Sequence, residues 1–234
     1  MRALLIANAE DADSGFVGQR LRHHGYSFVE CHREHPDEWP ELAGHDLVLS
    51  LGSEWSVYWP EVADSVAAEA GVIQAAHTAG VPVFGICYGN QMMAHALGGT
   101  VERAREPEVG WMDIVSDEPM VIAEGPWMQW HSDVVTVPGN ATELARSAAG
   151  PQAWHLGRSF CTQFHPEVNE GIIHRWAHSA GGVAELTSRG SSPDELLAIT
   201  RANVDEAQAN SDRIVDWFCE TIATTHPGAV LDLR

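Results

Sequence analysis

The stretch VFGICYGNQ occupies residues 83–91, where a short apolar run leads into the pattern Gly-x-Cys-x-Gly. A helical pattern of apolar residues follows over residues 92–97. This order is that of a nucleophile elbow, a sharp strand-to-helix turn, with cysteine in the position that serine often holds. Gly85 and Gly89 supply the small neighbours that such a turn demands. The turn lifts the Cys87 side chain above the sheet at a helix N-terminus, where the helix dipole favours a thiolate. We therefore predict that Cys87 is a nucleophile. The alternative is a buried cysteine in a glycine-containing turn.

A thiol nucleophile needs a base, and one histidine stands out from the 13 in the chain. His165 lies in the run TQFHPE, residues 162–167. A β-prone run precedes it and is expected to carry it to the edge of the same sheet, and Pro166 ends that strand. Glu167 follows two residues later, where its carboxylate is able to turn back and hold the imidazole in one tautomer. The pattern predicts a triad of Cys87, His165 and Glu167. The alternative is a packed histidine beside a surface glutamate.

The sequence before the elbow predicts an α/β fold. Three short apolar segments, residues 3–8, 46–51 and 81–86, are typical of buried parallel strands. Helical patterns separate them, one ending near Gly25 and the other, which includes residues 62–70, closing at Gly80. Strands that alternate with helices indicate βαβ units with right-handed crossovers.

The sequence after the elbow no longer alternates between apolar strands and helical patterns. Short β-prone runs separated by Gly and Pro predict antiparallel strands added to the sheet edge, at residues 111–115, 120–123, 134–137 and 160–164. Helical patterns return from about residue 168. Ser192 and Pro193 open a long amphipathic pattern that runs to about Thr224, with a break near Asn210. We expect one domain over residues 1–180 and a C-terminal helical extension, residues 181–234, packed on the same domain.

Composition and charge argue against several function classes. The formal charge of −20, spread along the chain, argues against a nucleic-acid surface. No apolar run approaches the roughly 20 residues of a membrane helix. The N-terminus lacks the features of a signal peptide, so we expect a cytoplasmic protein. The cysteines at positions 31, 87, 161 and 219 lack metal or redox spacing. The histidines at positions 23, 24, 32 and 35 lack partners at ligand spacing, and we expect no metal and no cofactor.

The motifs GICYGNQ and QFHPE together resemble those of the class I glutamine amidotransferases, the family that includes the glutaminase domain of GMP synthetase. Four flanking segments extend the resemblance over about residues 3–180: AGVPVFG at 79–85, LGG at 97–99, EVGW at 108–111 and QWHSD at 129–133. The resemblance implies a doubly wound, flavodoxin-like α/β fold with a mostly parallel central sheet. It also implies a thioester mechanism. In that mechanism Cys87 attacks the side-chain amide of glutamine, His165 protonates the departing ammonia, and water then releases glutamate.

The resemblance also assigns substrate-binding residues. It implies that Gln91 lines the glutamine pocket. It further implies that the backbone near Ser132 and Asp133 binds the α-amino and α-carboxylate groups of the substrate. His131 is expected either to order this substrate loop or simply to pack. The Tyr88 backbone N–H is expected to be one oxyanion donor, because the residue after an elbow nucleophile points its N–H at the developing charge.

The sequence departs from the family at the second oxyanion donor. The family usually has Gly-Gly-Pro where this chain has Gly52, Ser53 and Glu54. A serine backbone N–H donates as well as that of glycine, so we expect Gly52 and Ser53 to form this part of the oxyanion hole. Glu54 and Trp55 are expected on the leaving-group side of the substrate pocket, or facing a partner.

Three functions follow from these expectations. The first is a glutaminase that supplies ammonia to an ATP-dependent synthetase on another polypeptide, since the chain has no P-loop and no dinucleotide-binding glycine motif. The second is a free-standing hydrolase of γ-glutamyl peptides or γ-glutamyl amines. The third is a non-catalytic binding module with the same fold, which a lost nucleophile would have favoured.

Overall fold

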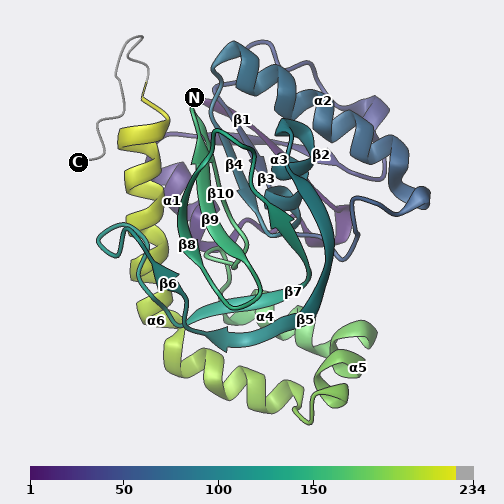
Figure 1. Ribbon diagram of the computed structural model, residues 1–234, viewed down its shortest axis with the longest axis vertical. Helices are drawn as coiled ribbons and strands as arrows, with labels where there is room; N and C mark the ends of the chain where they lie inside the picture. Colours follow the sequence, from purple (N-terminus) through teal and green to yellow (C-terminus); the bar gives the residue numbers. More distant parts are fainter. Residues whose placement is uncertain (225–234) are drawn as a thin grey trace.

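The computed structural model describes residues 1–224 of the chain, and its centre is one large mixed sheet (Figure 1). The strand order is β2-β1-β3-β4-β10-β9-β8-β6. Strands from β2 to β10 in this order pair in parallel, and β9, β8 and β6 extend the sheet in antiparallel fashion. In chain order the strands of this sheet are β1 (Arg2–Ala7), β2 (Ser27–His32), β3 (Leu47–Ser50), β4 (Val83–Ile86), β6 (Val115–Ser116), β8 (Thr142–Arg146), β9 (Pro151–Leu156) and β10 (Ser159–Thr162).

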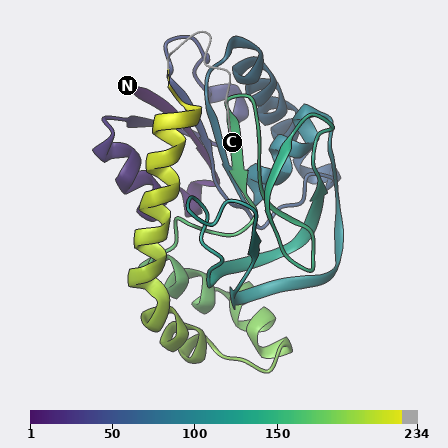
Figure 2. The same ribbon diagram turned by 60° about the vertical axis from the view of Figure 1, so that its left-hand side comes forward.

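Helices cover both faces of the sheet, which explains why its central strands are nearly continuous apolar runs. Helix α1 (Gly15–His23) and the C-terminal part of α6 (Pro193–Trp217) pack on one face. Figure 2 shows α6 running along the length of the sheet. Helices α2 (Ala63–Ala79) and α3 (Tyr88–Leu97) pack on the other face. The predicted α/β fold with a mostly parallel central sheet and antiparallel edge strands is confirmed.

Several details of the predicted sheet are wrong. β10 pairs in parallel with β4 inside the sheet, whereas residues 160–164 were expected as an antiparallel edge strand. Residues 120–123 form turns and coil instead of a strand. β5 (Thr100–Met112) and β7 (Trp127–Thr136) pair only with each other in a separate two-stranded sheet. Strand β2 was not predicted, because its side chains are mostly exposed or half-buried at the sheet edge and give no apolar run.

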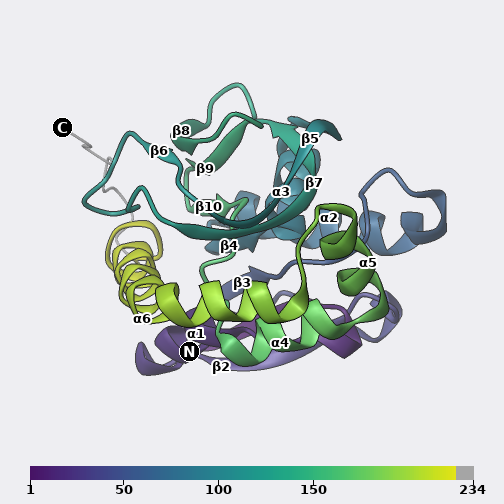
Figure 3. The same cartoon turned by 90° about the horizontal axis from the view of Figure 1, so that it is seen from below.

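The C-terminal helices pack on both the small β5–β7 sheet and the large sheet. Helices α4 (Glu170–His178) and α5 (Ala180–Ser188) pack with the first part of α6 against β7, and Figure 3 shows this layer beside β5 and β7. Ser192 caps α6 by accepting a hydrogen bond from the Glu195 N–H at 3.3 Å. The expected break near Asn210 is wrong, because α6 continues through it to Trp217, and a π-helical turn (Phe218–Ile222) follows. The last ten residues of the extension, 225–234, lie outside the described residues.

Candidate active site

Cys87 stands at the carboxyl end of β4 and directly before α3, in a strained turn. Its backbone angles are φ 52° and ψ −101°, and it has the sole positive φ of a non-glycine residue within residues 1–224. Such angles cost free energy and persist only where the surroundings enforce them. The surroundings here are close: a Cβ on Gly89 would lie 2.2 Å from the carbonyl oxygen of Ser50. Strand β3 therefore packs directly against the start of α3 and fixes the position of the Cys87 side chain.

Replacement of Gly89 by alanine is expected to lower the free energy of unfolding by about 1–3 kcal/mol, because backbone atoms of β3 must move to admit the methyl group. Gly71→Ala is the matched control, since a Cβ there meets nothing within 4 Å on helix α2. The control should stabilise the protein by about 0.5–1 kcal/mol. Urea unfolding of both variants measures the difference, and equal stabilities would contradict this account of the elbow.

His165 and Glu167 form a buried pair beside the elbow. The Nδ1 atom of His165 lies 2.7 Å from Oε1 of Glu167, and both side chains are 3% exposed. The His165 N–H donates to the Met128 carbonyl oxygen at 2.9 Å, which ties the segment after β10 to β7. The other ring nitrogen, Nε2, is buried and has no hydrogen-bond partner among the described residues. The structure thus leaves that nitrogen available on the side where Cys87 lies.

The protonation of His165 depends on its two neighbours. Burial by itself lowers the pKa of His165, but the charges of Glu167 and Cys87, together with the hydrogen bond to Glu167, outweigh burial and raise the pKa well above its usual range. Nδ1 faces a carboxylate, which only accepts hydrogen bonds, and this fixes a proton on that nitrogen. The arrangement favours an imidazolium beside the sulfur.

Removal of either charged neighbour is expected to lower the pKa of His165. In Cys87→Ala and in Glu167→Gln, His165 should lose its proton at a lower pH than in the unmodified protein, because one stabilising negative charge is gone while burial remains. Nitrogen-detected NMR of the imidazole signals measures this shift. The pKa of His155, which burial lowers, should stay the same in all three proteins. An unchanged His165 titration would show that the two neighbours do not control it.

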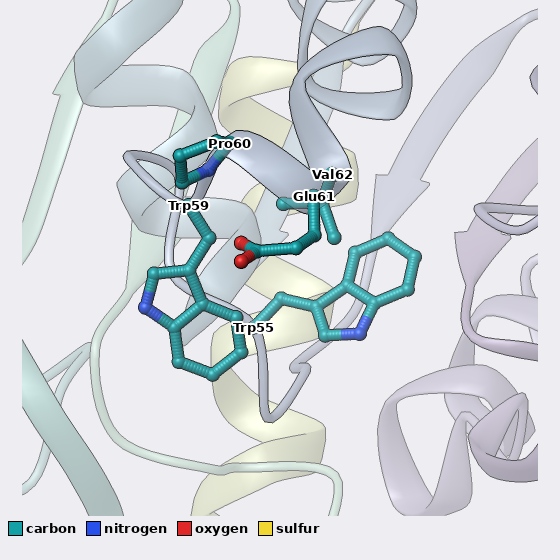
Figure 4. A pocket seen from close by; sticks show the side chains of 5 residues that line it. All are labelled: Trp55, Trp59, Pro60, Glu61 and Val62. Atoms are coloured by element: carbon teal, nitrogen blue, oxygen red, sulfur yellow. The ribbon is translucent and has the colours of Figure 1, made fainter.

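The loop after β3 lies next to His165 and Cys87. A Cβ on Gly52 would lie 3.1 Å from Cε1 of His165 and 3.8 Å from Cβ of Cys87. The Ser53 hydroxyl accepts a hydrogen bond from the Trp55 N–H at 3.1 Å, so this side chain is engaged within its own loop. Glu54 is exposed. Trp55 lines an open pocket in which the Glu61 carboxylate lies between two indole rings; the other lining residues are Trp59, Pro60 and Val62 (Figure 4).

The residues expected to bind substrate fall into two groups. The Gln91 N–H donates to the Cys87 carbonyl oxygen at 3.1 Å, one helical turn from the elbow. Its side-chain oxygen is buried and has no hydrogen-bond partner within residues 1–224. Strand β7 carries the second group, His131 to Asp133, and the Trp130 carbonyl oxygen of that strand lies 3.9 Å from the Cys87 sulfur.

The side chains of the second group are engaged within the protein. The carboxylate of Asp133 accepts hydrogen bonds from the hydroxyls of Ser56 at 2.6 Å and Tyr58 at 2.8 Å. It therefore ties the loop after β3 to β7. His131 contacts the carboxylate of Glu108 through Nε2 and the carbonyl oxygen of Asp133 through Nδ1. His131 is thus held between Glu108 and Asp133. Its role at the substrate loop stays a prediction, as does the substrate contact of the Ser132 and Asp133 backbone.

Three residues near the site were not predicted from the sequence. Trp176 of α4 packs edge-on against His165 with ring centroids 4.9 Å apart. Arg33 and Glu69 form a buried ion pair behind the loop after β3. A lone tryptophan in a helix gives no signal for such a role. Arg33 gave one weak signal, since it is one of few cations in an acidic chain.

The described residues show no grouping of three or more His, Cys, Asp or Glu side chains suited to a metal ion. Among the helices that the structure describes, none has the length and apolar character to cross a bilayer.

Fold and site together define an α/β protein of the nucleophile-elbow class, with a cysteine at the elbow and a histidine–glutamate pair beside it. The model of the family Glutamine amidotransferase class-I matches residues 20–174. The chain is 34% identical over 185 residues to a GMP synthase [glutamine-hydrolyzing] from Aeropyrum pernix, covering 73% of this chain and 34% of the relative. A protein of the same name from Corynebacterium glutamicum is 31% identical over 220 residues, covering 88% and 40%. The chain therefore belongs to the class I glutamine amidotransferase family, as its motifs predict.

Solved structures agree with this assignment. A glutamine amidotransferase from Thermotoga maritima has a TM-score of 0.82 and 27% sequence identity, covering 94% of this chain and 98% of that one. A second, from Methylobacillus flagellatus, has a TM-score of 0.80 at 20% identity, covering 97% and 96%, and supports the fold. The chain spans only about a third to two fifths of the length of the GMP synthases it matches.

Proposed function

We propose that the protein hydrolyses the side-chain amide of glutamine through a cysteinyl thioester at Cys87 and passes ammonia to an acceptor bound by a partner synthetase. One observation carries the proposal. A buried histidine–glutamate pair and an elbow cysteine meet at the carboxyl ends of two adjacent parallel strands, β4 and β10.

In the proposed reaction Cys87 acts first as nucleophile and then as leaving group, and His165 acts first as acid and then as base. The Cys87 thiolate attacks the amide carbon, and the carbonyl oxygen becomes an oxyanion held by the backbone N–H groups of Tyr88 and Ser53. His165 gives its proton to the amide nitrogen, the carbon–nitrogen bond breaks, and ammonia and a thioester result. His165 then takes a proton from water, which attacks the thioester, and glutamate leaves as the thiolate reforms. Glu167 orients the imidazole throughout.

The substrate assignment rests on Gln91 and the β7 backbone. The Gln91 side-chain oxygen, buried and without a partner within residues 1–224, is free to accept a hydrogen bond, and the substrate offers donors in its amide and α-amino groups. The backbone at Ser132 and Asp133 binds the α-amino and α-carboxylate groups. We propose this substrate-binding region as part of one domain over residues 1–180, with residues 181–234 as its helical extension.

The partner proposal draws on the relatives. The GMP synthases are matched over about a third to two fifths of their length, so most of each relative lies outside the match. We propose that a separate synthetase takes the place of that remainder. A glutaminase of this kind gains full competence when its partner closes over the pocket.

The substrate preference of the isolated chain tests the proposal. We expect slow hydrolysis of glutamine and no marked preference for γ-glutamyl dipeptides or γ-glutamyl amines. The measurement is kcat/KM for glutamine beside a small γ-glutamyl panel. A preference for any γ-glutamyl compound above about a hundredfold, some 2.7 kcal/mol of discrimination, would instead assign a free-standing γ-glutamyl hydrolase.

A further inference from the structure

An ion pair lies fully buried behind the loop after β3. Nε of Arg33 donates to Oε2 of Glu69 at 2.8 Å, and both side chains are 0% exposed. Arg33 follows the edge strand β2, and Glu69 comes from helix α2. Burial of two charges costs more than their attraction usually returns, so such a pair is weak evidence for a stabilising role. Its contacts suggest a different role.

The guanidinium of Arg33 binds the backbone of the predicted oxyanion loop. One terminal nitrogen donates to the Gly52 carbonyl oxygen at 2.9 Å, and the other donates to the Leu51 carbonyl oxygen at 2.9 Å. The Gly52 carbonyl and the Ser53 N–H belong to one planar trans peptide and point in opposite directions. Arg33 therefore directs the Ser53 N–H away from itself. The loop is flanked on another side by His165 and Cys87, next to Gly52.

Arg33 also touches the residue that supplies the other predicted donor. Its guanidinium carbon lies over the Tyr88 ring, 4.6 Å from the ring centroid. Tyr88 is the first residue of α3, where the backbone N–H has no partner within the helix. The carboxylate of Glu69 also accepts a hydrogen bond from the Ser50 hydroxyl at 2.6 Å, on the strand that packs against Gly89. One buried cation thus contacts both segments that carry the oxyanion donors.

We propose that Arg33, oriented by Glu69, is a positioning residue that fixes the two halves of the oxyanion hole relative to each other. The proposal rests on the Cys87 acyl chemistry of the proposed function. Donors aimed in advance at the developing charge need no reorganisation during the reaction, and a small misplacement weakens them greatly. The planar guanidinium suits this task because it donates to two carbonyls and stacks on a ring at once, which an ammonium does not.

The primary test is Arg33→Lys, which keeps a positive charge opposite Glu69. We expect kcat for glutamine to fall by about 100-fold, while KM stays within about threefold. The rate at which iodoacetamide alkylates Cys87 should also stay within about threefold, because alkylation forms no oxyanion. The double variant Arg33→Gln/Glu69→Gln removes both buried charges together and should show the same pattern. This double variant replaces Arg33→Lys as the test if the lysine variant does not fold.

Arg158→Lys is the matched control. Arg158 also binds backbone carbonyl oxygens, those of Gly80, Ile222 and Ala223, but it lies at the turn between β9 and β10, away from the elbow end of β4. Its replacement should lower stability and leave kcat unchanged. If Arg33→Lys is folded and keeps full kcat, or if alkylation falls in parallel with kcat, the positioning role is wrong.

An ester substrate separates this proposal from the proposed function. Release of nitrophenol from p-nitrophenyl acetate reports acylation of Cys87 without any need for a glutamine pocket, and Cys87→Ala gives the background. If the unmodified protein acylates with the ester but ignores glutamine, the proposed function fails. Arg33 is then judged on the ester: slowing of at least tenfold in Arg33→Lys supports its role, and an unchanged rate refutes it. Absence of any Cys87-dependent acylation would overturn both proposals.

Discussion

Replacement of Cys87 by alanine is expected to reduce glutamine hydrolysis by at least about 10³-fold, because the remaining groups supply only binding and oxyanion stabilisation. The fold should persist, since one sulfur is lost at an elbow whose geometry depends on Gly89 and the end of β3. A glutamate-release assay measures the activity, and urea unfolding checks the fold. A variant that keeps most of its activity would refute the proposed mechanism.

Cys219→Ala is the control for this result. Burial and nearby carboxylates raise the pKa of Cys219 to about 12, and burial raises the pKa of Cys31 to about 11. Cys161 is buried still more deeply, and burial raises its pKa well above the usual range. These three thiols are therefore poor nucleophiles at neutral pH. A glutamine-analogue alkylator should label Cys87 alone, and equal labelling of all four cysteines would contradict a specially activated Cys87.

Replacement of His165 by alanine is expected to be nearly as damaging as loss of Cys87. The variant loses both the proton donor to the departing ammonia and the base that activates water. Glu167→Gln should retain at least about tenfold more activity than His165→Ala, because the carboxylate orients the imidazole and does not itself exchange the proton. The comparison uses kcat from the same glutamate-release assay.

The Trp176 contact allows a control for packing in this experiment. Trp176→Phe keeps an aromatic ring beside His165 but removes the hydrogen bond that the indole donates to Asp11 at 2.8 Å. This variant should retain most of the activity. If it loses as much as His165→Ala, disturbed packing rather than lost proton transfer would explain both results.

The three predicted triad residues were accessible from the sequence because each lies in a compact local motif. Cys87 follows β4, and His165 comes shortly after β10, so two motifs far apart in the chain meet once these strands are neighbours. The sequence did not reveal that neighbourhood. The run at residues 160–164 has the same apolar character in an interior parallel strand as in an antiparallel edge strand, and only the pairing with β4 distinguishes them.

The Arg33–Glu69 pair was inaccessible for a related reason. The two residues are 36 positions apart, on a strand end and a helix, and neither lies in a motif. A charged residue read alone is expected at the surface. Burial of the pair follows from tertiary packing, which brings Glu69 of α2 over the end of β3. The contacts of the Asp133 carboxylate were inaccessible for the same reason, because its hydroxyl partners Ser56 and Tyr58 lie far away in the sequence, in the loop after β3.

The packing of the C-terminal end of α6 on the large sheet has a consequence for synthesis of the chain. Phe218, which follows α6, packs against Phe84 of β4 with ring centroids 5.1 Å apart, and Ile214 and Val215 share the same buried cluster. Until the ribosome has released these residues, α1 is present on this apolar face of β1, β3 and β4 without the cover that α6 adds beside it. Emerging chains with such a face are prone to aggregate and to bind chaperones. This face of the sheet therefore gains its full cover only after more than 210 residues have left the exit tunnel.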